Sequence, residues 1–158
     1  MRKILMLLFL FVSVCSFAKQ HVTVIVSLDG CRWDYPLMYD TPFLDSLGNR
    51  GVSAVMRPSF PSKTFPNHYT LATGLVPDHH GIIANRFYDV SSGRTYSISD
   101  KDTGKDGSFY GGEPIWLTAH RQGVKVGVVY WPGSDVAIQG QYPDYYKDYA
   151  QKPLLTYP

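Results

Sequence analysis

The chain has 158 residues, of which 44% are hydrophobic and 15% aromatic, and its formal net charge is +2. This length allows one domain with its own apolar core. The near-neutral charge lacks the strong positive excess of nucleic-acid-binding domains, so that class of function is excluded.

The N-terminus has the pattern of an export signal. Arg2 and Lys3 precede an apolar run over residues 4–14, and a small-x-small site ends at Ala18. This pattern predicts a signal peptide over residues 1–18 and an exported, periplasmic or secreted chain over residues 19–158. An uncleaved N-terminal anchor is the alternative. Without its signal the chain carries 13 basic and 13 acidic residues and a single cysteine, Cys31, so it forms no internal disulfide.

The next segments alternate between strand and helix patterns. Residues 21–27 form a nearly continuous β-branched run, which predicts a strand buried on both faces. Residues 41–50 predict a helix ended by Gly51, and residues 52–56 predict a second strand. This order indicates an α/β fold with a mainly parallel sheet. Asp29 follows the first strand at the edge where such sheets bind ligands, although a turn or capping role is equally open.

Residues 61–74 contain a polar turn and then a predicted helix. Thr64 stands at the start of this helix, Pro66 suits its first turn, and Gly74 is a natural stop. A hydroxyl at a helix N-terminus lies where a phosphate is favoured. Most threonines in this position are only caps, so the pattern alone leaves both roles open.

The central segment offers a pair of histidines and a hairpin. His79 and His80 follow an acidic residue, which allows a metal role, but turn histidines are commoner than ligands. Residues 87–98 predict a β-hairpin with its turn at Ser91-Ser92-Gly93, and residues 99–108 predict a polar surface loop.

The last third predicts one helix and one buried strand. Residues 113–122 form an amphipathic pattern with Ile115, Trp116 and Ala119 on the inner face. Residues 124–130 predict a strand that delivers Asp135 to the same sheet edge as the first strand. Residues 141–158 are rich in tyrosine and proline and show no clear period.

Five motifs in this order carry a resemblance to a known family. They are Leu28-Asp29-Gly30-x-Arg32, Lys63-Thr64-Phe65-Pro66-Asn67-His68, His80-Gly81-Ile82-x-x-Asn85, Gly112-Glu113-Pro114-Ile115-Trp116 and Trp131-Pro132-Gly133-Ser134-Asp135. Together they resemble the N-terminal part of the nucleotide pyrophosphatase/phosphodiesterase (type I phosphodiesterase) family, in the alkaline phosphatase superfamily. The resemblance covers nearly all of residues 22–158.

The resemblance implies a hydrolase that uses two zinc ions and cleaves nucleotide pyrophosphate or phosphodiester bonds through a phospho-threonine intermediate. In that family pattern Thr64 matches the nucleophile, Thr64 and Asp29 match ligands of one zinc, and Asn85 matches the amide that holds a phosphate oxygen. The residues that match the nucleoside pocket or lie beside it are Phe65 and Tyr149, an aromatic pair for the base, with Trp131, Pro132, Asp135 and Lys63. A lipid phosphodiester is the alternative substrate.

The sequence departs from the family pattern in its metal ligands. The resemblance implies that the remaining zinc ligands come from an Asp-x-x-x-His element, an Asp-His pair and a late histidine, all beyond residue 158. Since catalytic zinc normally has three protein ligands, we expect at most a weak partial site in this chain. We therefore expect a truncated N-terminal part that is inactive alone. The alternative is a non-catalytic remnant or pseudoenzyme that binds nucleotides.

Overall fold

The computed structural model describes residues 22–148, and the chain divides into two units, residues 1–32 and residues 33–158. In the first unit residues 22–28 are extended but belong to no strand, and Val22 and Val26 are 86% and 76% exposed. The buried strand predicted for residues 21–27 is therefore wrong over its described part. A β-branched run favours extended backbone, but a strand also needs a neighbour for its hydrogen bonds.

A tight turn follows this extended segment. The Cys31 N–H donates to the Leu28 carbonyl at 3.2 Å, and Gly30 has a φ of +69°. A positive φ at the third position of such a turn favours glycine. Asp29 therefore occupies the second position of a turn and is exposed.

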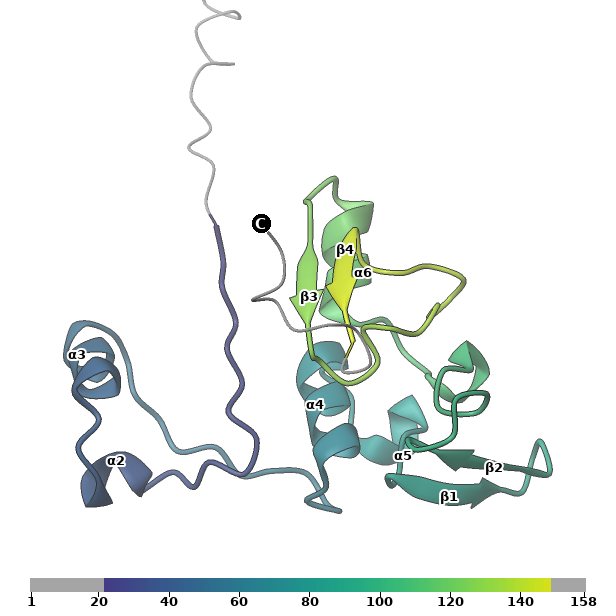
Figure 1. Cartoon of the computed structure of the whole chain (residues 1–158), viewed down its shortest axis with the longest axis horizontal. Helices are drawn as coiled ribbons and strands as arrows, with labels where there is room; N and C mark the ends of the chain where they lie inside the picture. The colour runs from purple at the N-terminus through teal and green to yellow at the C-terminus, as the bar shows by residue number, and fades with distance from the viewer. Residues whose placement is uncertain (1–21, 149–158) are drawn as a thin grey trace, which may run out of the picture. The chain divides into compact units, whose positions relative to one another are not determined.

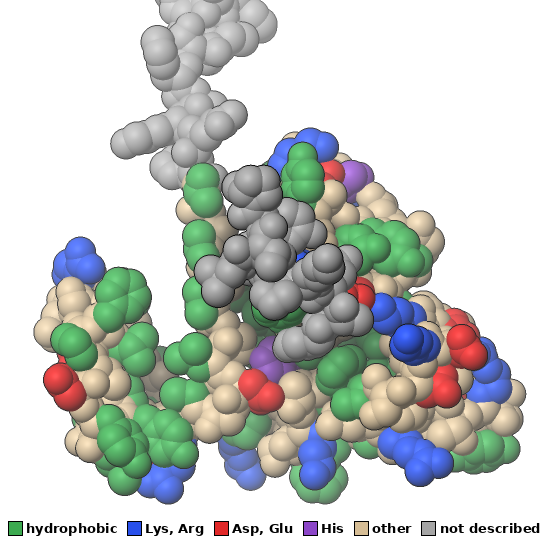
Figure 2. Space-filling model, in the orientation of Figure 1, with side chains coloured by type: hydrophobic (Ala, Val, Ile, Leu, Met, Phe, Trp, Pro, Cys, Tyr) green, Lys and Arg blue, Asp and Glu red, His purple; other side chains and the backbone are tan. Residues whose placement is uncertain are grey.

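Two helices open the second unit: α2, Tyr35–Met38, and α3, Pro42–Arg50. Helix α3 confirms the prediction for residues 41–50, and Gly51 follows its last turn. Its apolar side is uncovered, since Phe43 is 70% and Leu47 46% exposed, and Figure 2 shows hydrophobic side chains on the surface of this region. The strand predicted for residues 52–56 is wrong, because none of these residues is in a strand or pairs with one of the strands within residues 22–148.

Helix α4, Thr64–Thr73, confirms the predicted helix and is followed by the short α5, Pro77–His80 (Figure 1). Gly74 closes α4 with a φ of +69°, the left-handed conformation that glycine adopts without strain. Pro66 is buried in the first turn of α4, where its missing N–H removes no helical hydrogen bond.

The predicted hairpin is confirmed as strands β1, Arg86–Asp89, and β2, Arg94–Ser97, which pair antiparallel in the register Arg86↔Ser97 to Asp89↔Arg94. The Asp89 carboxylate accepts from Ser91 and Ser92 in the turn, and these hydrogen bonds lower its pKa. The following loop contains the 3-10 helix η1, Gly107–Phe109.

Helix α6, Ile115–Arg121, confirms the last predicted helix, and its predicted inner face only in part. Trp116 and Leu117 are buried, whereas Ile115 is 52% exposed. Strand β3, Gly127–Val129, is shorter than the predicted strand of residues 124–130 and pairs in parallel with β4, Tyr145–Lys147. Three residues are too few for a sequence period, so β4 was not predicted.

One aromatic-rich core unites α4, α6, the hairpin and the loop after β3. Tyr69 of α4 meets Tyr110 edge-on with ring centroids 5.3 Å apart, and Phe87 stacks on Tyr96 at 5.0 Å. The buried apolar side chains are Tyr69, Ala72, Ile82, Tyr96, Phe109, Tyr110, Trp116, Leu117, Val136 and Ile138.

The described residues thus form α-helices, one 3-10 helix and two small two-stranded sheets, one antiparallel and one parallel. The prediction of an α/β protein is met only in part, because the mainly parallel sheet is represented here by β3 and β4 alone. Within residues 22–148 no helix is both long enough and apolar enough to cross a lipid bilayer.

Asp144, directly before β4, connects this strand by hydrogen bonds to α6 and to the residues before β3. Its carboxylate accepts from the Val126 N–H at 3.0 Å, and from His120 and Lys125 at 3.1 Å each. These bonds, the Val126 one foremost, lower the Asp144 pKa from 3.8 to about 2.

A carboxylate with a lowered pKa stabilises the folded state above its unfolded-state pKa and loses that contribution as the pH falls. We therefore expect Asp144→Asn to flatten the decline in stability between about pH 4 and pH 2, the interval between the two pKa values of Asp144. Thermal unfolding of both proteins from pH 5 to pH 2 measures this, with the exposed Asp40→Asn as control. Parallel curves for wild type and Asp144→Asn would contradict it.

Candidate active site at the start of α4

Thr64 is the first residue of α4 and is half-buried, directly after the extended Lys63. The first turn has fewer available N–H groups than the sequence pattern suggested. Pro66 has none, and the Phe65 N–H donates to the Asn85 side chain at 3.3 Å. Any anion at this helix end would therefore depend on side-chain donors as well as on the backbone.

The loop before Thr64 is held by a side chain from the helix that follows it. The Asn67 amide oxygen accepts from the Ser59 N–H at 2.8 Å, and its nitrogen donates to the carbonyls of Pro61 at 2.9 Å and Lys63 at 3.1 Å. Three hydrogen bonds from one amide thus fix the backbone on both sides of residue 62.

Asn85 reaches the start of α4 from the segment before β1. Its backbone carbonyl accepts from the Ile98 N–H at 3.0 Å, and its Oδ1 accepts from Phe65. With Oδ1 identified as the acceptor, Nδ2 is the donating end of the amide. The structure therefore brings a side-chain donor group next to the first turn that carries Thr64.

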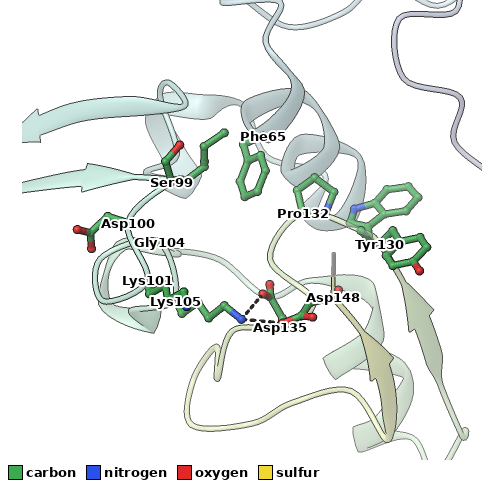
Figure 3. A pocket seen from close by; sticks show the side chains of 13 residues that line it. Phe65, Ser99, Asp100, Lys101, Gly104, Lys105, Tyr130, Pro132, Asp135 and Asp148 are labelled. Carbon is green, nitrogen blue, oxygen red and sulfur yellow. Dashed lines mark hydrogen bonds and ion pairs between the residues drawn. The ribbon is translucent and has the colours of Figure 1, made fainter. Parts of the chain in front are cut away.

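A cavity of about 440 Å³ lies beside the same helix start (Figure 3). Four of the predicted pocket residues line it, Phe65 from α4 with Trp131, Pro132 and Asp135 from the loop after β3. Trp131 is fixed to α4, because its indole N–H donates to the His68 carbonyl at 3.0 Å and its ring meets the His68 ring edge-on at 5.4 Å.

The opposite wall was not predicted. It is formed by residues 98–101, 104 and 105, all but the first of which the sequence suggested were only a surface loop. Lys105 pairs with Asp135 at 3.0 Å and Asp148 at 2.8 Å, as the dashed lines in Figure 3 show. Hydrogen bonds to Asp148 and then Asp135 raise the pKa of Lys105. Its charge was visible in the sequence, but its partners are 30 and 43 residues away.

Tyr130, another lining residue, has a φ of +56°, which is uncommon for a residue with a side chain. Its N–H donates to the Lys147 carbonyl at 2.9 Å. The chain thus turns directly after β3 into the Trp131 loop, while the end of β4 holds that turn. No pattern in the sequence marks this conformation.

The remaining predicted site residues lie elsewhere. Lys63 is exposed, and neither Lys63, Thr64 nor Asn85 lines the cavity. Asp29 belongs to the first unit, and Tyr149 lies outside the described residues.

His80 has a structural role. It is fully buried, its Nδ1 accepts from the Ile82 N–H at 3.2 Å, and its Nε2 lies 3.0 Å from the Thr70 hydroxyl. Burial lowers its pKa, so the neutral ring with hydrogen on Nε2 fits both contacts. Both nitrogens are therefore occupied by protein partners, which leaves none for a metal.

The described residues do not fit the family's zinc centre. Within residues 22–148 no group of three or more His, Cys, Asp or Glu side chains is placed to hold a metal ion. Catalytic zinc normally has three protein ligands.

The model of the family described as "Type I phosphodiesterase / nucleotide pyrophosphatase" matches residues 23–155. The chain belongs to this family. It is 48% identical over 130 residues to bovine (Bos taurus) ectonucleotide pyrophosphatase/phosphodiesterase family member 3, and 45% identical over 130 residues to human member 1. Each alignment covers 80% of this chain, which spans only about 15% and 14% of these relatives.

A solved structure of murine ectonucleotide pyrophosphatase/phosphodiesterase 5 is also similar. It is an inactive threonine-to-alanine variant in complex with AMP, and it matches with a TM-score of 0.70 and 40% identity. The match covers 76% of this chain and 32% of the other. The chain is thus homologous to phosphoric diester hydrolases, and its fold is a part of theirs.

Proposed function

We propose that this chain is part of an exported nucleotide pyrophosphatase/phosphodiesterase, in which it supplies the nucleophile Thr64 and the nucleoside cleft. The observation that carries the proposal is the position of Phe65. Its backbone N–H is bonded to Asn85, its side chain lines the cavity opposite residues 98–105, and Thr64 directly precedes it.

The proposed reaction proceeds in two displacements. The Thr64 hydroxyl gives its proton to solvent as its oxygen attacks phosphorus, the bond from phosphorus to the leaving group breaks, and a phospho-threonine ester to a nucleoside monophosphate forms. Water then attacks the same phosphorus and the bond from phosphorus to the Thr64 oxygen breaks. The Thr64 oxygen takes up a proton as the monophosphate is released. Asn85 Nδ2 donates to a non-bridging oxygen, where negative charge grows in each step. The inactive threonine-to-alanine relative bound to AMP supports a threonine in this role.

We propose that the whole protein requires two zinc ions, with Asp29 and Thr64 as two of the ligands. Most of the others must come from residues outside 22–148, because those residues include no ligand set of three. A zinc-bound site would supply the activation that a threonine hydroxyl needs before it can attack.

A non-catalytic nucleotide-binding protein is the second candidate, favoured by that same shortage of ligands in the described part. Hydrolysis of p-nitrophenyl thymidine 5′-monophosphate by the full-length protein, with and without a zinc chelator, distinguishes the two. Chelator-sensitive release of nitrophenol supports the enzyme. AMP binding without turnover supports the second candidate. The absence of both AMP binding and turnover would contradict both candidates.

Phe65→Ala is expected to raise the KM for nucleotide substrates, because it removes a ring on which a base can stack. Such stacking is worth roughly 1–3 kcal/mol, or about 5- to 150-fold in affinity. Bis(p-nitrophenyl) phosphate, which has no base, should be affected less. Phe43→Ala on α3 is the control, since Phe43 is 70% exposed and lies outside the cavity wall. Equal effects on both substrates would contradict a base-stacking role.

A further inference from the structure

One wall of the cleft is a compact loop with its own internal hydrogen bonds. The Asp100 side chain accepts from the N–H of Asp102 at 3.0 Å and of Thr103 at 2.8 Å, and from the Thr103 hydroxyl at 3.0 Å. The Gly104 N–H donates to the Asp100 carbonyl at 2.9 Å. A Cβ on Gly104 would come within 2.7 Å of two backbone oxygens, so only glycine fits.

This loop is joined to the core by a buried tyrosine. The Tyr110 hydroxyl donates to the Gly104 carbonyl at 2.8 Å, and the Tyr96 hydroxyl lies 2.8 Å from the Tyr110 hydroxyl. Since a carbonyl only accepts, the Tyr110 hydrogen is used on Gly104, and Tyr96 must donate to Tyr110. The hydrogen bonds therefore run in one direction, with Tyr96 donating to Tyr110 and Tyr110 donating to the Gly104 carbonyl.

Both hydroxyls stay protonated at neutral pH. Tyr96 is fully buried and Tyr110 is 4% exposed. Burial raises the pKa of Tyr96 to about 12 and raises that of Tyr110 further. Both therefore remain hydrogen-bond donors at neutral pH.

Lys105 follows Gly104 directly in the chain and faces the cleft, where it pairs with Asp135 and Asp148. The carbonyl that Tyr110 holds belongs to the peptide that joins Gly104 to Lys105. Because this peptide is bonded to the Lys105 Cα, holding the Gly104 carbonyl oxygen in place restricts the position of the Lys105 backbone and so of the base of its side chain.

We infer that Tyr110 is a positioning residue for the nucleotide: its hydroxyl, oriented by Tyr96, holds the loop of residues 98–105 as the wall opposite Phe65 and Pro132. This inference rests on the proposed function, because it takes the cleft to be the nucleoside site. By this inference two core residues, Tyr96 and Tyr110, influence the affinity of the cleft for nucleotide although neither lines it.

Two variants of the full-length protein separate this role from ordinary core packing. Tyr110→Phe and Tyr96→Phe each remove one buried hydroxyl and the same bond between the two rings, but only Tyr110→Phe releases Gly104. A typical hydrogen bond contributes about 0.5–1.5 kcal/mol. We therefore expect Tyr110→Phe to raise the KM for p-nitrophenyl thymidine 5′-monophosphate about two- to tenfold, while kcat changes little. Tyr96→Phe should raise this KM by a smaller factor.

Hydrogen exchange provides the readout that does not depend on activity. Amides of residues 99–105 should exchange faster in Tyr110→Phe than in Tyr96→Phe. If Tyr110→Phe fails to fold, Thr103→Val removes the hydrogen bond from the Thr103 hydroxyl to Asp100, which loosens the same loop without changing a lining side chain, and should raise KM in the same way.

Equal KM values in the two tyrosine variants would overturn the inference, and so would faster loop exchange with an unchanged KM. If the wild-type protein neither cleaves nor binds nucleotide, the proposed function fails instead. Exchange would then still report whether Tyr110 holds the loop, so the two failures are distinguishable.

Discussion

Thr64→Ala in the full-length protein is expected to lower kcat for p-nitrophenyl thymidine 5′-monophosphate by a factor on the order of 10³ or more. The variant lacks the oxygen that forms the phospho-threonine ester, so no covalent intermediate can arise. Affinity for AMP should be retained, because Phe65 and Trp131 still line the cleft. Steady-state kinetics and AMP titration measure the two effects.

Thr73→Ala is the matched control, since Thr73 is the last residue of the same helix. Its hydroxyl donates to the Tyr69 carbonyl at 2.8 Å and accepts from the Leu75 N–H at 3.2 Å, both close to the end of the helix that is remote from Thr64. It should leave kcat close to the wild-type value. Thr64→Ser keeps a hydroxyl and should retain part of the activity. Substantial turnover by Thr64→Ala would remove Thr64 from the mechanism.

Asn85 should show the second-largest loss. Removal of a single donor to a developing oxyanion typically costs about 10²–10³ in kcat. Asn85→Ala removes this donor together with the acceptor for the Phe65 N–H, which lies 3.3 Å away. We therefore expect a fall of about that size in kcat, measured with the same substrate.

Asn85→Asp separates the two contacts of the amide. An aspartate can still accept from Phe65, but it offers no donor and brings a negative charge towards the phosphate. It should be at least as inactive as Asn85→Ala while unfolding at a temperature closer to wild type. An active Asn85→Asp protein would show that the Phe65 bond matters and that donation to phosphate does not. Asn49→Asp on the exposed face of α3 controls for the added charge.

The parts of the fold that the sequence predicted are those with local causes. Thr64 begins a helix because Pro66 fits a first turn and Gly74 can take a left-handed φ within ten residues of it. The hairpin formed where two short alternating runs flank Ser91-Ser92-Gly93, and Gly93 has a φ of +66°. In each case the interactions that decide the structure lie within one turn or one hairpin.

The parts that were missed depend on partners far away in the chain. The β-branched run of residues 22–27 is ready to be a strand but has no neighbour among the described residues, while the tyrosine-rich segment Tyr145–Lys147 became a strand because β3 lies beside it. Likewise the sequence pattern placed Ile115, Trp116 and Ala119 on the inner face of a helix, and only packing decided that Leu117 rather than Ile115 is covered.

The same division holds for the site. By itself the sequence determined the family, because the order of its motifs is written along the chain, and the resemblance then implied the roles of Thr64, Phe65 and Asn85. Only the tertiary structure decided that Lys105 bridges Asp135 and Asp148, and that Tyr110 anchors the loop carrying it. Those contacts need folding to place the loop, the end of β4 and the buried tyrosines together. The sequence shows which chemical groups are available, and the packing of the folded chain determines which of them come into contact.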